Sequence, residues 1–189
     1  MDQGVIANNM FFKEYFTKIK ESLDLIESPE LEKLVKIIIN TSRENKKIIL
    51  AGNGGSASIA SHLSVDFTNA ARIRAINFND TGIITCFSND YGYKNWVSRA
   101  LTCYADSGDL LILISSSGQS ENMLIGGDKA KNMGVNVVTL TGFSPDNPLR
   151  KLGDINLWAN SNEYNIVEMT HHVWLLAVVD YIIKNNKEQ

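Results

Sequence analysis

Residues 47–69 read KIILAGNGGSASIASHLSVDFTN, and the rest of the chain can be interpreted outward from this stretch. Ile48 to Ala51 is a short, branched apolar run, which is typical of a buried strand. Three of residues 52–55 are glycine, which allows a tight turn, and Ala57 to Phe67 can be helical with Ser56 as the cap. The pattern therefore predicts a strand, a glycine turn and a helix start whose free N–H groups suit a phosphate.

The glycine turn alone is a weak signal, because glycines after a strand often only make a turn. Its spacing is neither the dinucleotide fingerprint nor the P-loop, which ends in Gly-Lys-Ser/Thr. Two further features strengthen the phosphate interpretation. One is a second hydroxyl-rich loop, and the other is the pair His62 and Asp66, four residues apart on the predicted helix.

The second loop follows the uninterrupted apolar run from Asp109 to Ile114, which is typical of a central parallel strand. Hydroxyls and helix-start N–H groups can surround a phosphate monoester without a lysine. The serines can instead simply cap the next helix, but four hydroxyls exceed what a cap requires. With no Lys or Arg in the loop, we expect a small sugar phosphate and no nucleotide. The four hydroxyls belong to Ser115, Ser116, Ser117 and Ser120.

Strands alternate with helices along the chain, which predicts an α/β, doubly wound sheet with ligands at the carboxyl ends of its strands. Residues 69–80 are expected to be a loop that covers the site. The other expected strands are 81–87, 109–114, 135–140 and 154–159, and the expected helices are 5–26, one from Ser28, one near 96–104, one to about 133, and 165–184.

The last helix repeats the pattern of the first motif, because Glu168 and His172 are also four residues apart. If the two helices meet, His62, Asp66, Glu168 and His172 form a site of two histidines and two carboxylates, which suits zinc or a similar divalent ion. The alternative is a buried hydrogen-bonded cluster without a metal. The residues do not separate these two interpretations.

Composition places the chain among ordinary globular proteins, with 189 residues, 44% of them apolar and 21% charged. A net charge of −3 gives no reason to expect nucleic acid or a membrane surface as a partner. The apolar run Val173 to Val179 is too short to cross a bilayer, and we find no signal-peptide pattern. Cys86 and Cys103 make neither a metal spacing nor a disulfide framework, so we expect packed thiols in a cytoplasmic protein.

Five motifs together make the chain resemble a sugar isomerase (SIS) domain, and specifically the bacterial phosphoheptose isomerases. The resemblance covers almost the full length. The motifs are Gly52-Asn-Gly-Gly-Ser56 followed by His62, Asn89-Asp-Tyr-Gly92, Ile114-Ser-Ser-Ser-Gly-Gln-Ser120, Val138-Thr-Leu-Thr-Gly142, and a final helix from about Asn165.

The resemblance implies a flavodoxin-like, five-stranded parallel sheet flanked by helices in one SIS domain over residues 1–189. It also implies a homotetramer with active sites between subunits, in which the N-terminal helical segment 1–45 serves packing and oligomerisation. Ser56, Ser115, Ser116, Ser117 and Ser120 are then expected to hold the phosphate, with Gly54 in the same turn, while Asn53, Asp90 and Glu168 contact the substrate.

The chain departs from the family pattern at the catalytic positions. The family has Glu where Asp66 stands here, and Gln where Glu168 stands. Its late histidine, the proposed acid and zinc ligand, corresponds to Leu176. His172 lies one turn nearer the start of the helix, and we expect it to substitute.

The resulting prediction is a phosphosugar isomerase that converts sedoheptulose 7-phosphate to D-glycero-D-manno-heptose 7-phosphate for surface polysaccharide synthesis, such as lipopolysaccharide or capsule. Asp66 is expected to be the base and His172 the acid, with zinc held by His62, Asp66, Glu168 and His172. Two alternatives stay open. One is an isomerase of another phosphosugar. The other is a non-catalytic SIS protein that binds a sugar phosphate or a protein such as the replication initiator DnaA.

Overall fold

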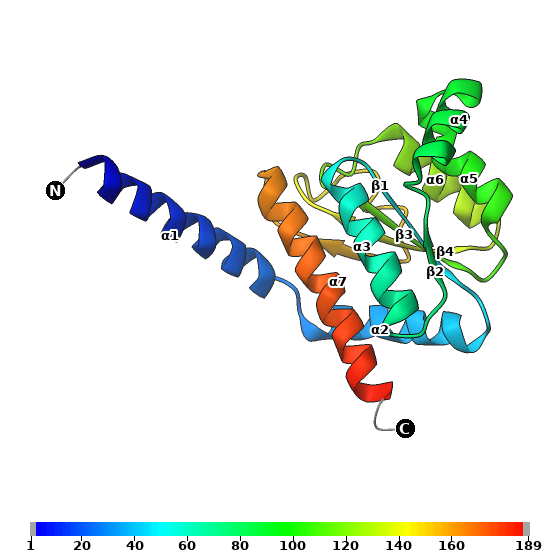
Figure 1. Ribbon diagram of the computed structural model, residues 1–189, viewed down its shortest axis with the longest axis horizontal. Coiled ribbons are helices and arrows are strands. Elements are labelled where there is room, and N and C mark those ends of the chain that lie inside the picture. Colours follow the sequence, from blue (N-terminus) through cyan, green and yellow to red (C-terminus); the bar gives the residue numbers. More distant parts are fainter. Residues whose placement is uncertain (1–2, 187–189) are drawn as a thin grey trace.

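A five-stranded, entirely parallel sheet forms the centre of the protein (Figure 1). The computed structural model describes residues 3–186. The strand order β2-β1-β3-β4-β5 is the flavodoxin-like order, so the predicted doubly wound fold is confirmed. The strands are β1 (Ile48–Gly52), β2 (Ala75–Asn77), β3 (Leu110–Ser115), β4 (Asn136–Thr141) and β5 (Ile155–Trp158).

Helices cover both faces of this sheet. One face packs against α2, α3 and α7, and the other packs against α4, α5 and α6 (Figure 1). The helices are α1 (Gln3–Asp24), α2 (Ser28–Arg43), α3 (Gly55–Asn69), α4 (Thr81–Tyr91), α5 (Trp96–Tyr104), α6 (Glu121–Asn132) and α7 (Tyr164–Asn186), with a 3-10 turn, η1, at Tyr93–Asn95.

The two central strands, β1 and β3, are buried along their whole length. Because successive strand side chains point to opposite faces, alternate residues enter different cores. Ile48 and Leu50 pack on the side of α3 and α7, whereas Ile49 and Ala51 pack on the side of α5 and α6. This two-sided burial explains why both strands read as unbroken apolar runs in the sequence.

The prediction of a strand over residues 81–87 is wrong, because these residues form the first part of α4. The carboxylate of Asp80 accepts hydrogen bonds from the backbone N–H groups of Gly82 (2.8 Å) and Ile83 (3.1 Å), which starts a helix there. Ile83, Ile84 and Phe87 then pack together on the α5–α6 side, as one helical stripe. The missing strand is β2, a three-residue edge strand inside the stretch predicted to be a loop.

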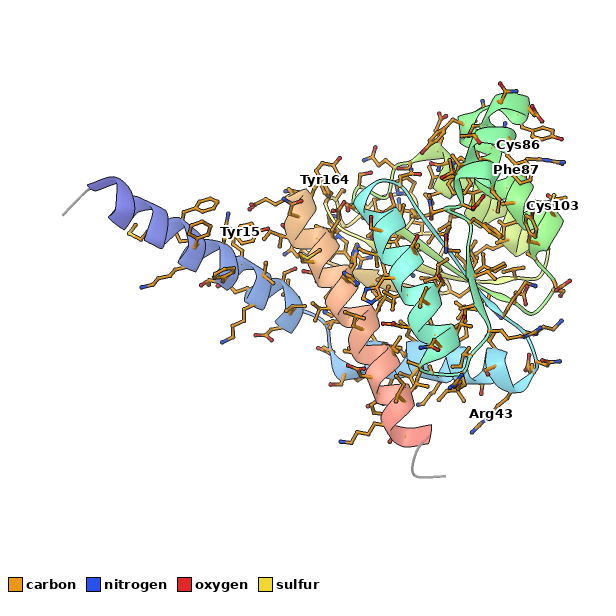
Figure 2. The ribbon with its side chains drawn as sticks, in the orientation of Figure 1. Tyr15, Arg43, Cys86, Phe87, Cys103 and Tyr164 are labelled. Atoms are coloured by element: carbon orange, nitrogen blue, oxygen red, sulfur yellow. The ribbon has the colours of Figure 1, made fainter. Side chains whose placement is uncertain are left out.

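Both cysteines lie on the surface of the chain, which corrects the expectation of packed thiols. Cys86 and Cys103 are on α4 and α5, at the outer side of that helical layer (Figure 2). The error at Cys86 follows from the strand predicted over residues 81–87. In such a strand Cys86 could point into the core, whereas in α4 it faces solvent. At Cys103 the apolar stripe of α5 runs through Trp96, Val97, Ala100 and Leu101 and leaves the cysteine outside.

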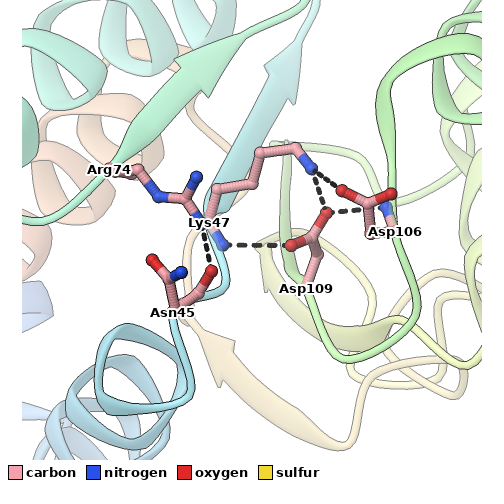
Figure 3. Close-up of polar contacts among 5 residues, drawn as sticks. All are labelled: Asn45, Lys47, Arg74, Asp106 and Asp109. Atoms are coloured by element: carbon pink, nitrogen blue, oxygen red, sulfur yellow. Dashed lines mark hydrogen bonds and ion pairs between the residues drawn. The ribbon is translucent and has the colours of Figure 1, made fainter.

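A paired cluster of charges closes the amino-terminal end of β1 and β3 (Figure 3). Asp109, which is 1% exposed, receives the Lys47 ammonium at 2.6 Å and the Lys47 backbone N–H at 3.0 Å. Asp106 contacts the same ammonium at 2.7 Å. Burial lowers the pKa of Lys47, but the hydrogen bonds with both aspartates outweigh this and raise it overall. The cluster joins residues that are far apart in the sequence.

The first helix extends away from the body of the protein (Figure 1). Only its last turns are attached: Lys18 pairs with Glu163 at 2.7 Å, and the Leu23 carbonyl accepts a hydrogen bond from the Trp174 indole at 3.2 Å. Further out, Met10, Phe11, Phe12 and Phe16 are each more than half exposed. Figure 2 shows the Tyr15 ring on this projecting part. These exposed apolar side chains between residues 10 and 16 are not covered by any other element within the part of the chain that the structure describes.

The last helix is the apolar core helix that the sequence predicts. Its span Tyr164–Asn185 has a mean hydropathy of 1.4, which by length and composition would allow it to cross a membrane. Half of that window is nevertheless buried inside the protein. Trp174, Leu175, Val178, Val179 and Ile182 belong to the core between the helix and the sheet. The burial is what a central helix of a globular fold shows.

Candidate functional site

The two predicted ligand loops lie beside each other at the carboxyl ends of β1 and β3. Gly52 and Ile114 are paired in the ladder, so both loops leave the sheet at the same level. The first loop leads into α3 on one face of the sheet, and the second leads into α6 on the other face. The strand order reverses between β1 and β3, which is where flavodoxin-like sheets bind their ligands.

The glycine loop is held by contacts from two other segments. Gly54 stands at the N-cap of α3 with φ 56°, a conformation that favours glycine. At Gly55 any Cβ would overlap the carboxylate of Glu168, so α7 lies directly on this turn. Asn79, after β2, accepts from Gly52 N at 3.2 Å and donates to Gly52 O at 2.7 Å. The turn is therefore rigid before any ligand binds.

Ser56 does not cap the helix as predicted, because Gly54 takes the N-cap position and Ser56 lies inside the first turn of α3. Its side chain is 3% exposed and packs against Gly52, where an added Cβ would collide with it. This close approach requires glycine at position 52, because the colliding Ser56 atoms are its backbone C and O and its Cβ. Its predicted role as a phosphate contact stays a prediction.

The serine loop carries hydroxyls that its own helix does not use. Ser120 is at the N-cap of α6, but among the described residues its side chain makes no capping hydrogen bond. Ser116 is 5% exposed, and its hydroxyl finds no partner within residues 3–186. Ser117 accepts from the Gln119 N–H at 3.3 Å, and Ser115 ends β3. A buried, unpaired hydroxyl costs free energy, so this loop is suited to an incoming acceptor.

A cleft of about 580 Å³ opens beside these loops. Of the predicted substrate residues it contains Asn53 and Ser120. Asp90 lies outside it, exposed at the end of α4, where Asn89 donates to its carboxylate at 2.9 Å. The remaining lining residues are Gly92, Tyr93, Lys94, Glu121 and Asn122.

Tyr93, Lys94 and Asn122 are site residues that the sequence reasoning missed. The motif Asn89-Asp-Tyr-Gly92 ends just before Tyr93. Extending it by two residues includes Tyr93 and Lys94, the first two residues of η1. Lys94 changes the electrostatics, since it brings a cation to a loop that has none in sequence. Asn122 follows Ser120 by two residues and is 2% exposed, which marks it as a built part of the site.

A second polar group lies further along α3, where it packs against α7. The Nδ1 atom of His62 contacts Nε2 of His172 at 2.8 Å, and Nε2 of His62 contacts the Asp66 carboxylate at 3.2 Å. A neutral imidazole has one N–H and one lone pair. If His62 donates to Asp66, it must accept from His172, so the three side chains form one directional hydrogen-bond chain. The prediction that the two helices meet is thus confirmed at these residues.

Burial shifts the pKa of the two α7 side chains that were predicted as site residues. Desolvation lowers the pKa of His172, and the neighbouring His62 lowers it further. Desolvation also raises the pKa of Glu168, whose carboxylate lies against Gly55. A neutral His172 has one N–H and one lone pair, so it either donates to His62 or accepts from it, depending on its tautomer.

These residues do not fit a zinc site in this arrangement. Within the described part of the chain, no group of three His, Cys, Asp or Glu side chains is placed to hold a metal ion. His62 has one ring nitrogen against Asp66 and the other against His172, so the two partners lie on opposite sides of its ring. A tetrahedral site needs ligands that converge on one point. Glu168 lies instead over the glycine turn.

Leu176, at the position of the family's late histidine, packs against the core beside α3 and the sheet. It has no group that can donate or accept a proton. His172, one turn earlier, takes the place nearest to His62 and Asp66 through its 2.8 Å contact. The geometry agrees with the expectation that His172 substitutes for the missing histidine, and its catalytic role stays a prediction.

The carboxyl end of β4 is connected to α7 through a buried histidine. His171 is fully buried, and its Nε2 donates to the carbonyl of Thr141 at 2.9 Å. The next residue, Gly142, donates its N–H to the carbonyl of Ser116 at 2.8 Å. Burial lowers the pKa of His171 to about 4, so the ring is neutral and keeps this hydrogen bond. The helix that carries Glu168 and His172 is thereby fixed relative to the serine loop.

Two comparisons with known sequences identify relatives of the chain. The model of the SIS domain matches residues 12–142. The phosphoheptose isomerase of Aliarcobacter butzleri is 33% identical over 177 residues, which cover 90% of this chain and 91% of the relative. That of Cytophaga hutchinsonii is 41% identical over 117 residues, or 59% of this chain and 61% of the relative.

Solved structures share the fold closely. A phosphoheptose isomerase from Francisella tularensis has a TM-score of 0.86 at 24% identity and covers 98% of this chain and 100% of its own. The enzyme from Neisseria gonorrhoeae has a TM-score of 0.85, also at 24% identity, with 95% of this chain and 98% of its own covered. The SIS match spans most of the chain, and the sequence similarity to the Aliarcobacter enzyme runs along nine-tenths of it. The chain belongs to the SIS-domain family of phosphoheptose isomerases.

Proposed function

We propose that this protein is a phosphosugar isomerase that interconverts sedoheptulose 7-phosphate and D-glycero-D-manno-heptose 7-phosphate. The observation that carries the proposal is the pair of loop-to-helix junctions at the switch point, with the unpaired Ser116 hydroxyl beside them. Membership of the phosphoheptose isomerase family supports the substrate. The product is a precursor of the kind used for heptose-containing surface polysaccharides.

The phosphate is held, in this proposal, by the serine loop and the start of α6. Hydroxyls of Ser115, Ser116, Ser117 and Ser120 and the free N–H groups of the helix start donate to its oxygens, with Gly54 and Ser56 closing the other side. Lys94 adds the one cation that lines the cleft. Asn53, Asp90 and Glu168 are assigned to the sugar. Binding through the remote phosphate fixes the reacting carbons and thereby lowers the entropy lost at the barrier.

The chemistry needs one base and one acid. Asp66 removes the proton from C1 of the ketose, the electron pair forms the C1–C2 double bond, and the C2 oxygen takes a proton to give a cis-enediol. Return of a proton to C2, with loss of the C1 hydroxyl proton, gives the aldose. His172 is the assigned acid, and His62 connects it to Asp66 through the 2.8 Å and 3.2 Å contacts.

One protomer does not supply the whole site. Asp66 follows Gly55 by eleven residues, so it lies about 16 Å along α3 from the phosphate loops. That is longer than a seven-carbon sugar phosphate. We infer that the loops of one copy act with Asp66 and His172 of another, in a homotetramer with shared active sites. The exposed aromatic side chains of α1 support this assembly, because they need a surface to cover them.

The shared site is tested by mixing two defective proteins, one with a lowered kcat and one with a raised KM, at a substrate concentration below the wild-type KM. Co-expressed Asp66→Asn and Ser120→Ala subunits are expected to form hybrid tetramers in which some sites contain neither substitution, and activity returns there. Light scattering gives the mass, and Phe12→Glu with Phe16→Glu on α1 is expected to break the tetramer. A monomeric wild type with full activity would contradict the shared site, and hybrids without activity would place both groups on one subunit.

The reaction itself is tested by incubating the protein with sedoheptulose 7-phosphate in D₂O. We expect aldose formation together with deuterium at the carbon next to the carbonyl. Ser120→Ala is expected to raise KM about tenfold or more, since a hydrogen bond to a charged group is lost. Ser107→Ala, at the amino-terminal side of β3, is the matched control and keeps KM unchanged. Absence of exchange with every ketose and aldose phosphate offered would refute the proposal.

A second candidate function is favoured by Leu176. Without the family's late histidine, the protein can bind a phosphorylated sugar and act on a different one, or bind it without turnover as a regulatory SIS protein with a partner such as DnaA. A panel of phosphosugars separates these outcomes, because binding without exchange for any sugar identifies the non-catalytic case.

The remaining assignments of this proposal concern architecture and cofactors. We propose one SIS domain over residues 1–189, of which 1–2 and 187–189 lie outside the described residues, with 1–45 used in oligomer packing. We propose a cytoplasmic protein that uses no nucleotide and has neither nucleic acid nor membrane as a partner. Zinc at His62, Asp66, Glu168 and His172 stays a prediction that the observed arrangement does not favour. Metal analysis of the purified protein decides it.

A further inference from the structure

The side-chain amide of Asn53 is held by two neighbours from other parts of the chain. Its Nδ2 donates to Oδ1 of Asn122 at 3.1 Å, and Nδ2 of Asn122 donates back to Oδ1 of Asn53 at 2.9 Å. The hydroxyl of Tyr93 donates to the same Asn53 oxygen at 3.0 Å. Three segments therefore meet at one amide: the loop after β1, the first residue of η1 and the first turn of α6.

Counting these bonds shows what Asn53 can still do. An amide oxygen has two lone pairs, and both are filled here by Asn122 and Tyr93. The NH₂ group has two hydrogens, and one goes to Asn122. Within the part of the chain that the structure describes, this leaves Asn53 one N–H and no lone pair. It can donate to a ligand, but it has no acceptor capacity left for one.

The orientation of this amide is fixed by burial. Asn122 is 2% exposed, so it cannot exchange Asn53 for water as a partner. A rotation of Asn53 alone would place its NH₂ group against the NH₂ of Asn122 and leave two buried donors facing each other. The observed orientation of the pair is the one in which the Tyr93 hydroxyl donates to Asn53. Leaving such a buried group unsatisfied costs free energy. The two amides thus hold each other in place before substrate arrives, and the Tyr93 hydroxyl defines which side of Asn53 is the acceptor.

All three residues line the same cleft as Ser120 and Lys94. A donor-only group in a site for a sugar phosphate recognises an oxygen that accepts, and it recognises it more strongly as negative charge grows there. The sugar hydroxyls that the substrate would donate find no acceptor at Asn53. Phosphate oxygens accept as well, but the proposed function assigns them to Ser120 and Lys94 and assigns Asn53 to the sugar. The sugar oxygen that matches Asn53 is then the one that changes from carbonyl to enediolate during isomerisation.

We propose that Asn53 donates its remaining N–H to the substrate oxygen on which charge develops, and that Asn122 and Tyr93 are positioning residues that hold it as a pure donor. The inference rests on the proposed isomerase function. In this proposal the neutral amide of Asn53 stabilises the negative charge that develops on the substrate oxygen. The donor is preorganised, so no reorientation is needed as the charge appears.

The test compares two variants with matched controls. Asn53→Leu keeps the size but removes the donor, and we expect kcat to fall about 100-fold or more, with KM changed much less. Tyr93→Phe deletes only the hydroxyl, frees one lone pair on Asn53, and is expected to lower kcat about threefold to tenfold. Asn132→Leu at the exposed end of α6 and Tyr104→Phe on α5 are the controls, and both keep the wild-type kcat.

A binding measurement separates this role from a merely structural one. A hydroxamate that mimics the enediolate is expected to lose affinity for both Asn53→Leu and Tyr93→Phe, whereas inorganic phosphate binds as to the wild type. If the wild type is active but Tyr93→Phe and Asn53→Leu change only KM or melting temperature, the inference is wrong and the isomerase function stands. If the wild type neither isomerises nor exchanges protons, the proposed function itself fails.

Discussion

The two ends of the parallel sheet are built from similar polar residues but are completed in opposite ways. At the amino-terminal end, Asp109 is buried and receives the ammonium and backbone of Lys47 as well as the backbone N–H of Asp106, at 2.6–3.0 Å. At the carboxyl end, the Ser116 hydroxyl has no partner within residues 3–186. The first end is fully paired by the chain itself, whereas the second keeps donors free.

This difference separates stability from function. Paired buried charges at one end contribute to holding β1 beside β3, and their loss leaves a charge without a partner. Unpaired donors at the other end cost stability in the free protein and are satisfied only when an acceptor binds. Substitutions at the amino-terminal end should therefore change the free energy of unfolding, and substitutions in the site should change kinetics. Four predictions test this separation.

The largest effect is expected for Asp66→Asn. Without its carboxylate the site has no base for the C1 proton, so kcat should fall about 10³-fold, while sugar phosphate binding stays nearly intact. Steady-state kinetics and calorimetric binding of sedoheptulose 7-phosphate measure the two effects. Asp128→Asn, exposed on α6, is the control with unchanged kcat. Full turnover in Asp66→Asn would remove this residue from the mechanism.

The next largest effect is expected at the amino-terminal end of the sheet. Asp109→Ala leaves the Lys47 ammonium, which is 16% exposed, without its closest partner and should lower the free energy of unfolding by about 3–5 kcal/mol. Lys131→Ala is the control. It breaks a 3.8 Å ion pair with Asp154 in which the lysine side chain is 41% exposed and the aspartate 47%. Its loss should lower the free energy of unfolding by at most about 1 kcal/mol. Urea unfolding gives both values. Equal losses would show that burial does not distinguish the two ion pairs.

A pH effect on stability is expected from His171. Its pKa is lowered from 6.5 to about 4 in the folded protein because it is buried. The stabilisation is fully present above about pH 6.5 and is lost as the pH falls towards about 4, where the folded state must accept the proton. The shift corresponds to about 3 kcal/mol at most. Urea unfolding between pH 7 and 4 should show a shallower loss for His171→Asn, and parallel curves for both proteins would contradict the assignment.

The smallest effect is expected for Lys94→Met. The lysine lines the cleft but lies on the surface, so its attraction for the phosphate is screened and worth at most about 1 kcal/mol. KM should rise by up to about fivefold with kcat unchanged, and the difference from the wild type should shrink at high salt. Lys129→Met on α6 is the control. A salt-independent rise in KM would indicate lost packing in place of lost charge.

Local patterns predicted the parts of the fold that are buried on both sides. The apolar runs of β1 and β3, and the loops after them, are recognisable because two-sided burial leaves an uninterrupted signal in sequence. The run at 81–87 is also largely apolar, but only one side of it, with Ile83, Ile84 and Phe87, is partly buried. Asp80 at its start is the cap that makes it helical. Short apolar runs are ambiguous between strand and helix, and only the cap and the packing decide.

The candidate site divides in the same way. Asn53 and Ser120, both predicted to contact the substrate, line one cleft, since parallel strands bring their carboxyl ends together. Their contacts with a ligand stay predictions. Asn79, Tyr93 and Asn122 were not predicted, because each acts through a hydrogen bond to a residue at least 27 positions away. No periodicity or motif of a single segment reports such a bond.

The amino-acid sequence by itself determined the doubly wound α/β fold, the position of the two loops after β1 and β3 and the family, because these depend on local patterns of apolar residues, glycines and hydroxyls. Only the tertiary structure decided how His62, Asp66, Glu168 and His172 combine. They are donors suited to zinc, yet His62 lies between Asp66 and His172 while Glu168 lies over Gly55. The physical reason is the packing of α3 against α7, which sets the direction of each side chain and joins residues 110 positions apart.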